Sequence, residues 1–536
     1  MLERKQSVNT PSKPGAEAAP GAGCPRVQSG AMTRLLASLL ATAAALCVAG
    51  IAPAGAARER DAQRATSSAR APVVVSTQPG LSPRFRRSVS DYVTRCEGGK
   101  AVRITARAPR GARVRVAGRD LARGRAARVR LRPGQRFSIR VRAAGRSSVH
   151  HVRCLPGDFP RFSARRSGRT AAAGYLVTPS LSSGPLGQAY VAIFDSAGTP
   201  VWWMRDSAPS DAQLLADGNL AWVTPTEKGV GTDPRSAYEE HRLDGRLVRS
   251  IKAVGNPTDQ HELEPLPGGN VMVLAYRPRD GVDLSAYGGP ASATVLDAEI
   301  QELTPSGELA WSWSSKDHIG LEEAARWYRT QIIDGPTRLR DGRRAYDVVH
   351  ANSIEARGDQ VVMSARHTDA LYSISRSTGR IRWKLGGTPR AESLRVLGDS
   401  TRPPRTFGGQ HDTRLLADGT LTLFDNASFY ARAPRALRLR LDTRRRTARV
   451  LEDVRHRPAR RSLCCGSARR LPGGHWVISW ADRPLITELT SEGRVRVALR
   501  FAKLFSYRAF PIPRGRLDRR ALRRGMDAMQ RSRAPG

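Results

Sequence analysis

The sequence is poor in acidic residues, in lysine and in aromatic residues. Its 536 residues include 48 Asp and Glu against 89 Lys and Arg, which gives a formal net charge of +41, and only 6% are aromatic. Arginine is spread through the chain, and zinc-finger, helix-turn-helix and RNA-binding signatures are absent. We therefore expect no specific nucleic-acid partner. Loose association with anionic polymers or lipids of a cell envelope is the expected consequence of this charge.

Several motifs of common enzyme classes are also absent. The sequence contains no P-loop, no GxSxG nucleophile elbow, no HExxH zinc motif and no CxxC pair. These absences argue against the nucleotide, hydrolase and metal chemistries that depend on them. We accordingly predict that the protein uses neither a cofactor nor a metal ion.

Long apolar runs are lacking except near the start of the chain. The segment from Met32 to Ala57 combines the basic Arg34, the apolar stretch Leu35 to Ile51 and the small residues Ala54 to Ala56. This order is typical of a secretory signal with its cleavage site. A membrane anchor is the alternative, but the run is shorter than the roughly 20 residues that a span needs. We predict that residues 1–56 are an upstream extension and a signal peptide, and that the protein is secreted or associated with the cell envelope.

Cysteine is scarce, with six in the whole chain, of which two lie in the predicted signal region. Cys96 and Cys154 lie in the N-terminal part of the exported protein, where a disulfide between them would close a small domain. Cys464 and Cys465 are adjacent and either form a strained vicinal disulfide or stay as thiols. Metal binding by these cysteines is the weaker alternative, because the usual ligand spacing is missing.

The region after the signal divides into a linker, a small domain and a large one. Residues 57–84 are a polar linker. Residues 85–165 contain short runs that alternate apolar and polar residues, such as Val102 to Ala106, which predict a small antiparallel β-sandwich. Residues 513–536 are predicted to be a basic C-terminal tail.

A doubled repeat marks residues 166–512. One unit is a Leu-rich strand that ends in a glycine turn and resumes as a strand, and the other is a glycine turn with Trp four residues on. Clear copies of the first unit begin at the following residues: Leu214, Leu266, Leu415 and Leu471. Two such hairpins make one four-stranded blade, and the pairs sort into six blades. The predicted fold is therefore all-β, a six-bladed β-propeller preceded by a β-sandwich. The interval from Ser315 to Asp347 is predicted to be an insertion beside the axis, with a helix-like stretch from Leu321 to Arg329.

Three histidines occupy the same position in this repeat. Each lies eight residues before the turn glycine of its blade, and the pairs are His261 with Gly269, His350 with Gly358, and His411 with Gly419. A single histidine is most often a hydrogen-bonded structural residue. Three in register, among only ten in the chain, instead predict a ring of imidazoles at the mouth of the central channel.

An asparagine and an arginine accompany the second of these histidines. Asn352 lies two residues beyond His350, on the same face of the predicted strand, and Arg366 lies on the hairpin partner. The planar guanidinium fork of arginine suits a tetrahedral oxyanion, and asparagine and imidazole add further donors. The set therefore favours sulfate or phosphate esters as ligands.

These motifs resemble the bacterial arylsulfotransferases that work without a nucleotide sulfate donor. The resemblance runs over about residues 170–510 and rests on the stretches His350–Ile354 with Ser364–Arg366, Tyr372–Gly387 and Gln410–Asn426. It implies an exported six-bladed propeller that moves a sulfuryl group from an aryl sulfate to a phenolic acceptor in a ping-pong reaction. It also implies that His411 is the nucleophile that becomes sulfated. His261, His350, Asn352 and Arg366 would bind the sulfuryl oxygens and stabilise charge in the transition state.

Two other functions compete with this one. A non-catalytic ligand-binding propeller would need no histidine ring. A quinone-dependent dehydrogenase-like propeller is suggested by Thr378 to Trp383 with Gly386, which resemble a tryptophan-docking repeat. That repeat recurs in most blades of such dehydrogenases and is clear only once here, so we rank this function lowest.

Overall fold

The computed structural model describes residues 73–96, 100–180, 189–224, 231–401, 406–502 and 505–532. Contacts divide the chain into Met1–Ala69 and Arg70–Gly536, and every described residue lies in the second part. The predicted signal segment lies outside the described residues. The described part is built of β-sheets with few helices, so the all-β prediction is confirmed. Within it, no helix has the length and apolar character that crossing a membrane requires.

Two sheets form the region between residues 74 and 155. The first has the order β1-β3-β6, with β1 (Val74–Gln78), β3 (Val102–Arg107) and β6 (Ala126–Val129). The second has the order β2-β8-β7-β4-β5, with β2 (Asp91–Arg95), β8 (Arg146–Leu155), β7 (Arg136–Ala143), β4 (Arg113–Val116) and β5 (Arg119–Asp120). β1 pairs antiparallel with β3, so this strand belongs to a sheet although it lies before the predicted start of the small domain at residue 85. The linker predicted over 57–84 is wrong in this part, because its Val-rich end completes a sheet.

The apolar residues of both sheets pack into one buried cluster. Along β7 every second residue is buried, which is the alternation that the sequence showed. Val102, Ile104, Ile139 and Val141 are among its members. A disulfide joins Cys96 to Cys154 inside this cluster, as predicted.

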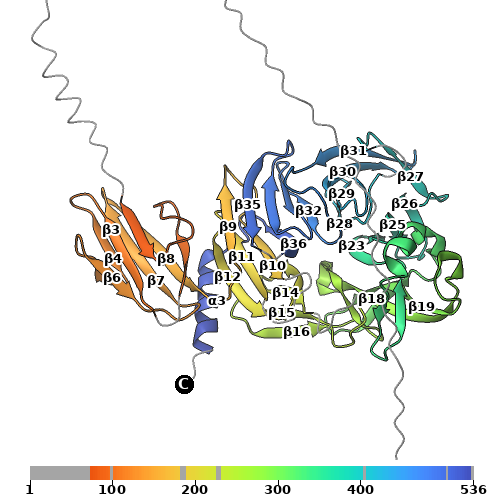
Figure 1. Cartoon of the computed structure of the whole chain (residues 1–536), viewed down its shortest axis with the longest axis horizontal. Coiled ribbons are helices and arrows are strands. Elements are labelled where there is room, and N and C mark those ends of the chain that lie inside the picture. The colour runs from red at the N-terminus through yellow and green to blue at the C-terminus, as the bar shows by residue number, and fades with distance from the viewer. Residues whose placement is uncertain are drawn as a thin grey trace, which may run out of the picture. The chain divides into compact units, whose positions relative to one another are not determined.

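The strands after residue 173 form antiparallel four-stranded runs (Figure 1). The first run has the order β12-β11-β10-β36, with β12 (Pro200–Asp206), β11 (Ala189–Asp195), β10 (Gly174–Ser180) and β36 (Phe505–Ile512). The second comprises β13 (Ser210–Leu214), β14 (Leu220–Val223), β15 (Tyr238–His241) and β16 (Leu247–Ile251). The third comprises β17 (Thr258–Pro265), β18 (Val271–Val282), β19 (Ala293–Leu303) and β20 (Leu309–Ser314), with η1 (Pro267–Gly269) and η2 (Ser285–Tyr287) in its turns.

Three further runs follow the same pattern. One comprises β23 (Ala351–Arg357), β24 (Gln360–Ala365), β25 (Ala370–Ser375) and β26 (Ile381–Gly386). The next comprises β28 (His411–Leu415), β29 (Thr420–Asp425), β30 (Arg435–Asp442) and β31 (Thr447–Val454), and β27 (Ser393–Leu397) pairs parallel with both β26 and β31. The last comprises β32 (Ser467–Arg470), β33 (Trp476–Ser479), β34 (Leu485–Leu489) and β35 (Val495–Phe501), and β9 (Phe162–Arg166) adds a fifth strand. Residues 162–165 therefore belong to this sheet and not to the small domain predicted to end at 165.

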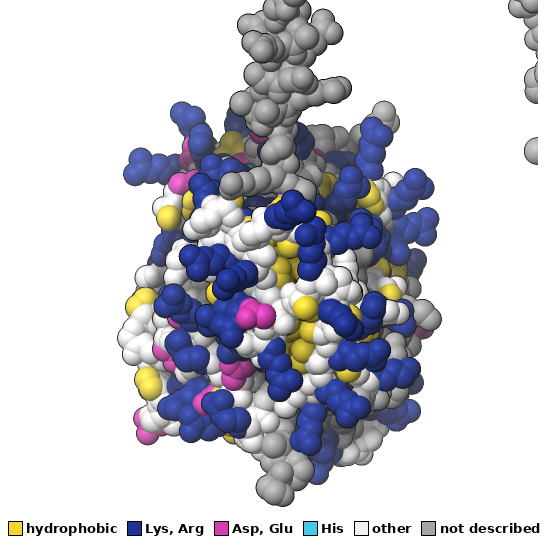
Figure 2. Space-filling view, turned by 90° about the vertical axis from the view of Figure 1, so that its left-hand side faces the viewer, with side chains coloured by type: hydrophobic (Ala, Val, Ile, Leu, Met, Phe, Trp, Pro, Cys, Tyr) yellow, Lys and Arg dark blue, Asp and Glu magenta, His cyan; other side chains and the backbone are white. Residues whose placement is uncertain are grey.

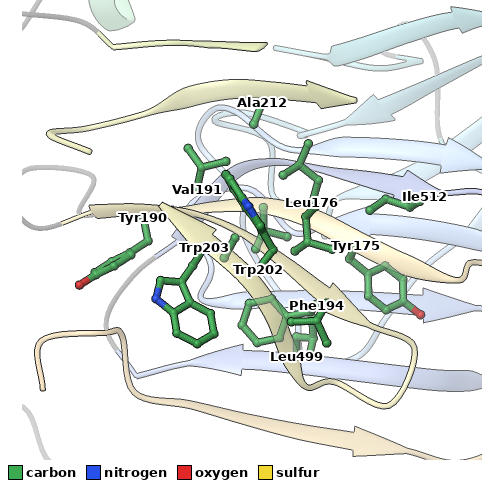
Figure 3. Packing of buried hydrophobic residues seen from close by; sticks show 14 of the residues in the cluster. Tyr175, Leu176, Tyr190, Val191, Phe194, Trp202, Trp203, Ala212, Leu499 and Ile512 are labelled. Carbon is green, nitrogen blue, oxygen red and sulfur yellow. The ribbon is translucent and has the colours of Figure 1, made fainter. Parts of the chain in front are cut away.

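Each run has one end strand, called here its first strand, that contacts the first strands of the two neighbouring runs, so that these strands form a closed cycle. β13 lies against β17, β17 against β23, β23 against β28, β28 against β32, β32 against β36, and β36 against β13. Because β36 pairs with β10, the end of the chain joins the run that its earliest strands began. Side chains from this junction form the largest apolar cluster, in which Trp202, Trp203 and Phe194 pack with Leu499 and Ile512 (Figure 3).

Two further segments also have defined structure. The interval 315–347 contains η3 (Leu321–Ala324), α2 (Ala325–Trp327) and η4 (Tyr328–Ile332), then β21 (Thr337–Arg338) and β22 (Arg344–Asp347), so it is helical where the sequence indicated. This interval adds β22 and β21 to the sheet of the third run. The C-terminal tail predicted over 513–536 is instead largely the helix α3 (Arg519–Ser532), which buries Leu522, Met526 and Met529. Its apolar residues repeat with helical spacing, and this signal was hidden among the eight arginines of the tail.

Candidate active site

The register of the first strands breaks where the sequence aligned the histidines. Pairing shifts occur between Thr258 and Leu263 around His261, just after His350, and directly after His411. Such bulges turn side chains away from the regular alternation and are common beside active sites. His350 and the residue after His411 also have φ angles of 52° and 56°, in the left-handed region that non-glycine residues rarely occupy.

His261 and His350 lie in contact, and each is held by a carboxylate. Their ring centroids are 4.9 Å apart. Nδ1 of His261 is 2.6 Å from Asp259 Oδ1, and Nδ1 of His350 is 2.5 Å from Asp347 Oδ2. A carboxylate at Nδ1 fixes the proton there and leaves Nε2 free to accept a proton. Among the described residues, neither Nε2 has a hydrogen-bond partner.

His411 is also held at Nδ1, but by neutral acceptors instead of a carboxylate. Its Nδ1 lies 2.9 Å from Gly409 O and 2.8 Å from Asn426 Oδ1, and both of these atoms are acceptors. The Asn426 amide cannot turn over, because its nitrogen donates to Ser462 Oγ and Cys465 O. The proton of His411 therefore resides on Nδ1, and Nε2 carries a lone pair. That lone pair accepts a hydrogen bond from the Cys465 backbone N–H at 3.1 Å.

The surroundings keep His411 neutral. Its side chain is only 1% exposed, and burial lowers its pKa well below the usual value. The charges of Arg366, His350 and His261 lower that pKa further, and the hydrogen bond to Asn426 opposes them only in part. A neutral imidazole with a lone pair on Nε2 is the form that a nucleophile needs.

Arg366 is buried beside these imidazoles. Its backbone N–H donates to His350 O, as expected of the hairpin partner, and its guanidinium lies over the Trp327 ring at 4.4 Å. Its terminal nitrogens donate to His367, to Gln331 and to Leu463 O. Its Nε–H has no hydrogen-bond partner. An unpartnered donor on a buried cation is a strong attractor for an anion.

Asn352 is buried against the strand of His411. Its amide nitrogen donates to Gln410 O at 2.7 Å, which places it beside the residue that precedes His411. Its Oδ1 is buried without a partner. The structure therefore brings Asn352 to the site, where one of its N–H groups fixes the backbone at His411.

Two residues of the site were missed by the sequence analysis. His367 donates through Nδ1 to Asp347 O, and its ring lies 4.6 Å from that of His350. Its position next to Arg366 was the available signal. Tyr507 comes from β36, far along the chain, and its ring lies 5.7 Å from that of His261. Its hydroxyl is buried without a partner, and no local pattern pointed to it.

The segment that contains Cys464 and Cys465 covers the site. Both cysteines are free thiols, which decides between the alternatives that the sequence left open. The Cys465 N–H donates a hydrogen bond to His411 Nε2, and Leu463 O accepts a hydrogen bond from Arg366 Nη2. A ligand that contacts both side chains must therefore displace this segment.

One group of residues has metal-ligand geometry. Candidate ligand atoms of Asp347, His350 and His367 lie within 4.8 Å of one another. Arg366 Nη1, however, donates to His367 Nε2 at 2.6 Å, and a cation would have to replace this guanidinium contact. The donor set fits a metal ion poorly, and we derive no step from one.

Comparisons with known proteins agree with the sequence motifs. The family model for arylsulfotransferases (ASST) matches residues 245–502. No curated protein matches the chain.

Similar solved structures include a putative 6-phosphogluconolactonase from Bacteroides fragilis, with 11% identity, a TM-score of 0.37 and coverage of 64% of this chain and 99% of that chain. A β-propeller domain from Myceliophteria thermophila has 12% identity, a TM-score of 0.34 and coverage of 64% and 89%. A quinoprotein alcohol dehydrogenase-like protein from Bacteroides thetaiotaomicron has 9% identity, a TM-score of 0.28 and coverage of 79% and 96%. At these TM-scores the likenesses to solved structures carry no argument, and among the comparisons the support for a family rests on the family model alone. Residues 245–502, which contain all three aligned histidines and Arg366, match the arylsulfotransferase family model, and this match supports the resemblance that the sequence motifs indicate.

Proposed function

We propose that the protein moves a sulfuryl group from an aryl sulfate to a phenol, with Nε2 of His411 as the nucleophile. The observation that carries this proposal is the tautomer of His411, which is fixed by two acceptors at Nδ1 and leaves the lone pair on Nε2, where the Cys465 N–H donates to it. We also propose that the six runs are blades of one propeller, because their first strands contact in a closed cycle. Export through residues 32–57 stays a prediction.

In the first half-reaction, the Nε2 lone pair attacks sulfur, and the bond from sulfur to the aryl oxygen breaks. The electron pair of that bond leaves with the phenolate. The Nδ1–H remains bound to Gly409 O and Asn426 Oδ1, which stabilise the positive charge that the ring gains. Arg366 Nε–H is available to a sulfuryl oxygen in the transition state.

In the second half-reaction, a phenol attacks the sulfur on His411 and the N–S bond breaks. The phenol proton must leave, and Nε2 of His350 or His261 can accept it because Asp347 or Asp259 holds the other ring nitrogen. This proton then passes to the departed phenolate or to solvent. Donor and acceptor use the site in turn, which is the basis of ping-pong kinetics.

The test of this function is incubation of the full protein with a chromogenic aryl sulfate and a phenol. We expect continued release of the chromophore only when the acceptor is present, release of no more than one equivalent per protein without it, and parallel double-reciprocal lines when both substrates are varied. Intersecting lines would show that donor and acceptor bind together, which contradicts a sulfated intermediate.

Replacing Arg366 by Ala should slow the transfer about 100- to 1000-fold, since removal of one such donor costs about 2.7–4 kcal/mol. Arg366→Lys should recover only part of this loss, because a point charge cannot reproduce the planar fork. The measurement is kcat/KM, with the exposed Arg340→Ala as a control that removes the same charge elsewhere. If Arg366→Ala equals Arg340→Ala, the guanidinium has no part in the reaction.

The lowered pKa of His411 makes a prediction about pH. Because the imidazole stays neutral below its ordinary pKa, the nucleophile remains active as pH falls through about 6.5. We expect kcat/KM to stay constant through this range and to fall only at lower pH. Arg366 is the largest charge that lowers this pKa, so Arg366→Gln should move the acid limb to higher pH. A wild-type acid limb at the ordinary histidine pKa would contradict the assignment.

A further inference from the structure

Positive charge is concentrated in one part of the molecule. Residues 74–155 contain 21 Lys and Arg against 3 Asp and Glu, whereas the much longer segment 156–536 contains 59 against 41. Each segment therefore has a net charge of +18, although the first is about a fifth as long. Arginine is spread through the chain, but acidic residues are few in this segment. Figure 2 shows the side on which they lie, with many Lys and Arg side chains and few Asp and Glu.

Four of these arginines lie opposite one another on one sheet face. In the pairing of β4 with β7, Arg113 is opposite Arg142 and Arg115 is opposite Arg140. All four are exposed, while the residues between them, such as Val114 and Val141, are buried in the core. Residues directly opposite in neighbouring strands point to the same face. We call these four residues the arginine face.

Like charges in this arrangement repel, so the arginine face is destabilising without an anion. Arg115 has a partial partner, because its Nε lies 3.4 Å from Asp120. Among the described residues, no carboxylate lies within ion-pair distance of Arg113, Arg140 or Arg142. Three guanidinium groups therefore face solvent with no acidic neighbour.

The same sheet contains another cross-strand pair of arginines, and this pair binds a carboxylate. Further along the pairing of β7 with β8, Arg136 lies opposite Arg153. Both donate to one carboxylate, with Arg136 Nη2 2.7 Å from Asp527 Oδ2 and Arg153 Nη2 2.9 Å from Asp527 Oδ1. This carboxylate comes from helix α3. A cross-strand arginine pair in this sheet thus accommodates one anionic group between its two forks.

We propose that the arginine face binds a linear acidic polysaccharide, whose carboxylate or sulfate groups occupy the positions that Asp527 occupies at the neighbouring pair. Pairs two residues apart in a strand recur about every 6–7 Å, so a chain with regularly spaced anionic groups can meet both pairs at once. Val149 is the one large apolar residue exposed on the described part of this face. The face therefore lacks the apolar side chains that enter a lipid surface and the aromatic rings on which bases stack.

The test uses the full protein and a heparin oligosaccharide, with polygalacturonate as a probe that carries carboxylates only. The variant Arg113→Ser/Arg140→Ser/Arg142→Ser removes three charges from the arginine face. The matched control Arg340→Ser/Arg444→Ser/Arg449→Ser removes three exposed charges from the large region. Substitutions at exposed positions leave the core intact, and an unchanged thermal midpoint verifies folding.

We expect the first variant to lose at least about ten-fold in affinity and to lower the slope of log Kd against log salt by about 2–3, as for three released contacts. The control should change affinity by less than about three-fold under the same counterion argument. Arg142→Glu should weaken binding more than Arg142→Ser. Binding of polygalacturonate as well as heparin would identify carboxylates as sufficient, and binding of heparin alone would identify sulfates.

Three results would overturn the proposal. Equal losses in the two triple variants would mean that net charge alone attracts the polymer. Failure of the wild-type protein to bind either polymer at physiological ionic strength would exclude the site. Binding to anionic vesicles, with the same dependence on Arg142 and without binding to either polysaccharide, would identify a lipid surface as the partner.

Discussion

A protein in which Ala replaces His411 should lose sulfuryl transfer by roughly four orders of magnitude or more, the scale seen when a catalytic nucleophile is removed. It should also fail to form a covalent adduct. When the wild-type protein is incubated with an aryl sulfate and no acceptor, its intact mass should rise by one SO3 group. After unfolding, this adduct should be lost in acid and kept in base, because an N-sulfonated imidazole is a good leaving group only while its other ring nitrogen carries a proton.

The reason for this large effect is that no other side chain of the cluster presents the same atom in the same state. Nδ1 of His411 faces two neutral acceptors, a carbonyl and an amide oxygen, whereas His261 and His350 each face a carboxylate. A carboxylate partner suits a histidine that receives a proton. A neutral partner and a lowered pKa suit a histidine that attacks through its lone pair.

His475 provides the matched control for this experiment. It also has its Nδ1 against a carboxylate, that of Glu488 at 2.6 Å, but it lies outside the cluster. His475→Ala should keep both the adduct and the turnover. If His411→Ala still transfers sulfate at the wild-type rate, His411 is not the nucleophile. Unchanged ligand affinity in a protein that never turns over would instead support the non-catalytic propeller.

The repeat made much of the fold readable from sequence. A glycine turn between two apolar strands is a local signal, and it located the hairpins of all six runs. The shared offset from that turn also located His261, His350 and His411, because equivalent positions in a repeat take equivalent places in space. Arg366 was found through its hairpin pairing with His350.

The remaining features depend on contacts that are distant in the chain. Asn426 fixes the tautomer of His411 from 15 residues away, and the Cys465 N–H reaches it from 54 residues away. Tyr507 meets His261 only because β36 returns to the strands of the first run. Strands β1 and β9 were missed for the same reason, since each completes a sheet whose other strands lie elsewhere. Periodicity within a short stretch of sequence gives no information about partners that lie far away in the chain.

A buried set of ion pairs links the first strands next to the candidate site, where Arg508 donates to Asn352 O. We call Asp211, Glu262, Asp412, Arg414 and Arg508 the central cluster, and these residues come from β13, β17, β28 and β36. Arg508 Nη1 lies 2.7 Å from Asp211 Oδ1 and 3.0 Å from Glu262 Oε2. Arg414 Nη2 lies 2.6 Å from Glu262 Oε2 and 2.9 Å from Asp412 Oδ1. The cluster therefore joins strands that share no backbone pairing.

The charges in this cluster depend on one another. Burial alone would raise the pKa of Asp412, but Arg469, Arg414 and Arg508 outweigh it and hold that pKa below its usual range. Burial raises the pKa of Glu262, and the same two arginines of the cluster oppose this shift. Removing one arginine leaves buried carboxylates without their cationic partner.

Replacing Arg508 by Met should therefore lower the free energy of unfolding by about 3–5 kcal/mol, the usual cost of breaking a buried pair on one side. The measurement is the urea midpoint at constant slope. Arg508→Met/Asp211→Asn should recover part of the loss, because one fewer buried carboxylate is left unpaired. As a control, Arg343→Met breaks the exposed pairs with Asp341 and Asp280 and should have a far smaller effect. Equal effects of Arg508→Met and Arg343→Met would mean that the backbone pairing and the apolar clusters hold the ring together, and that the central cluster adds nothing to its stability.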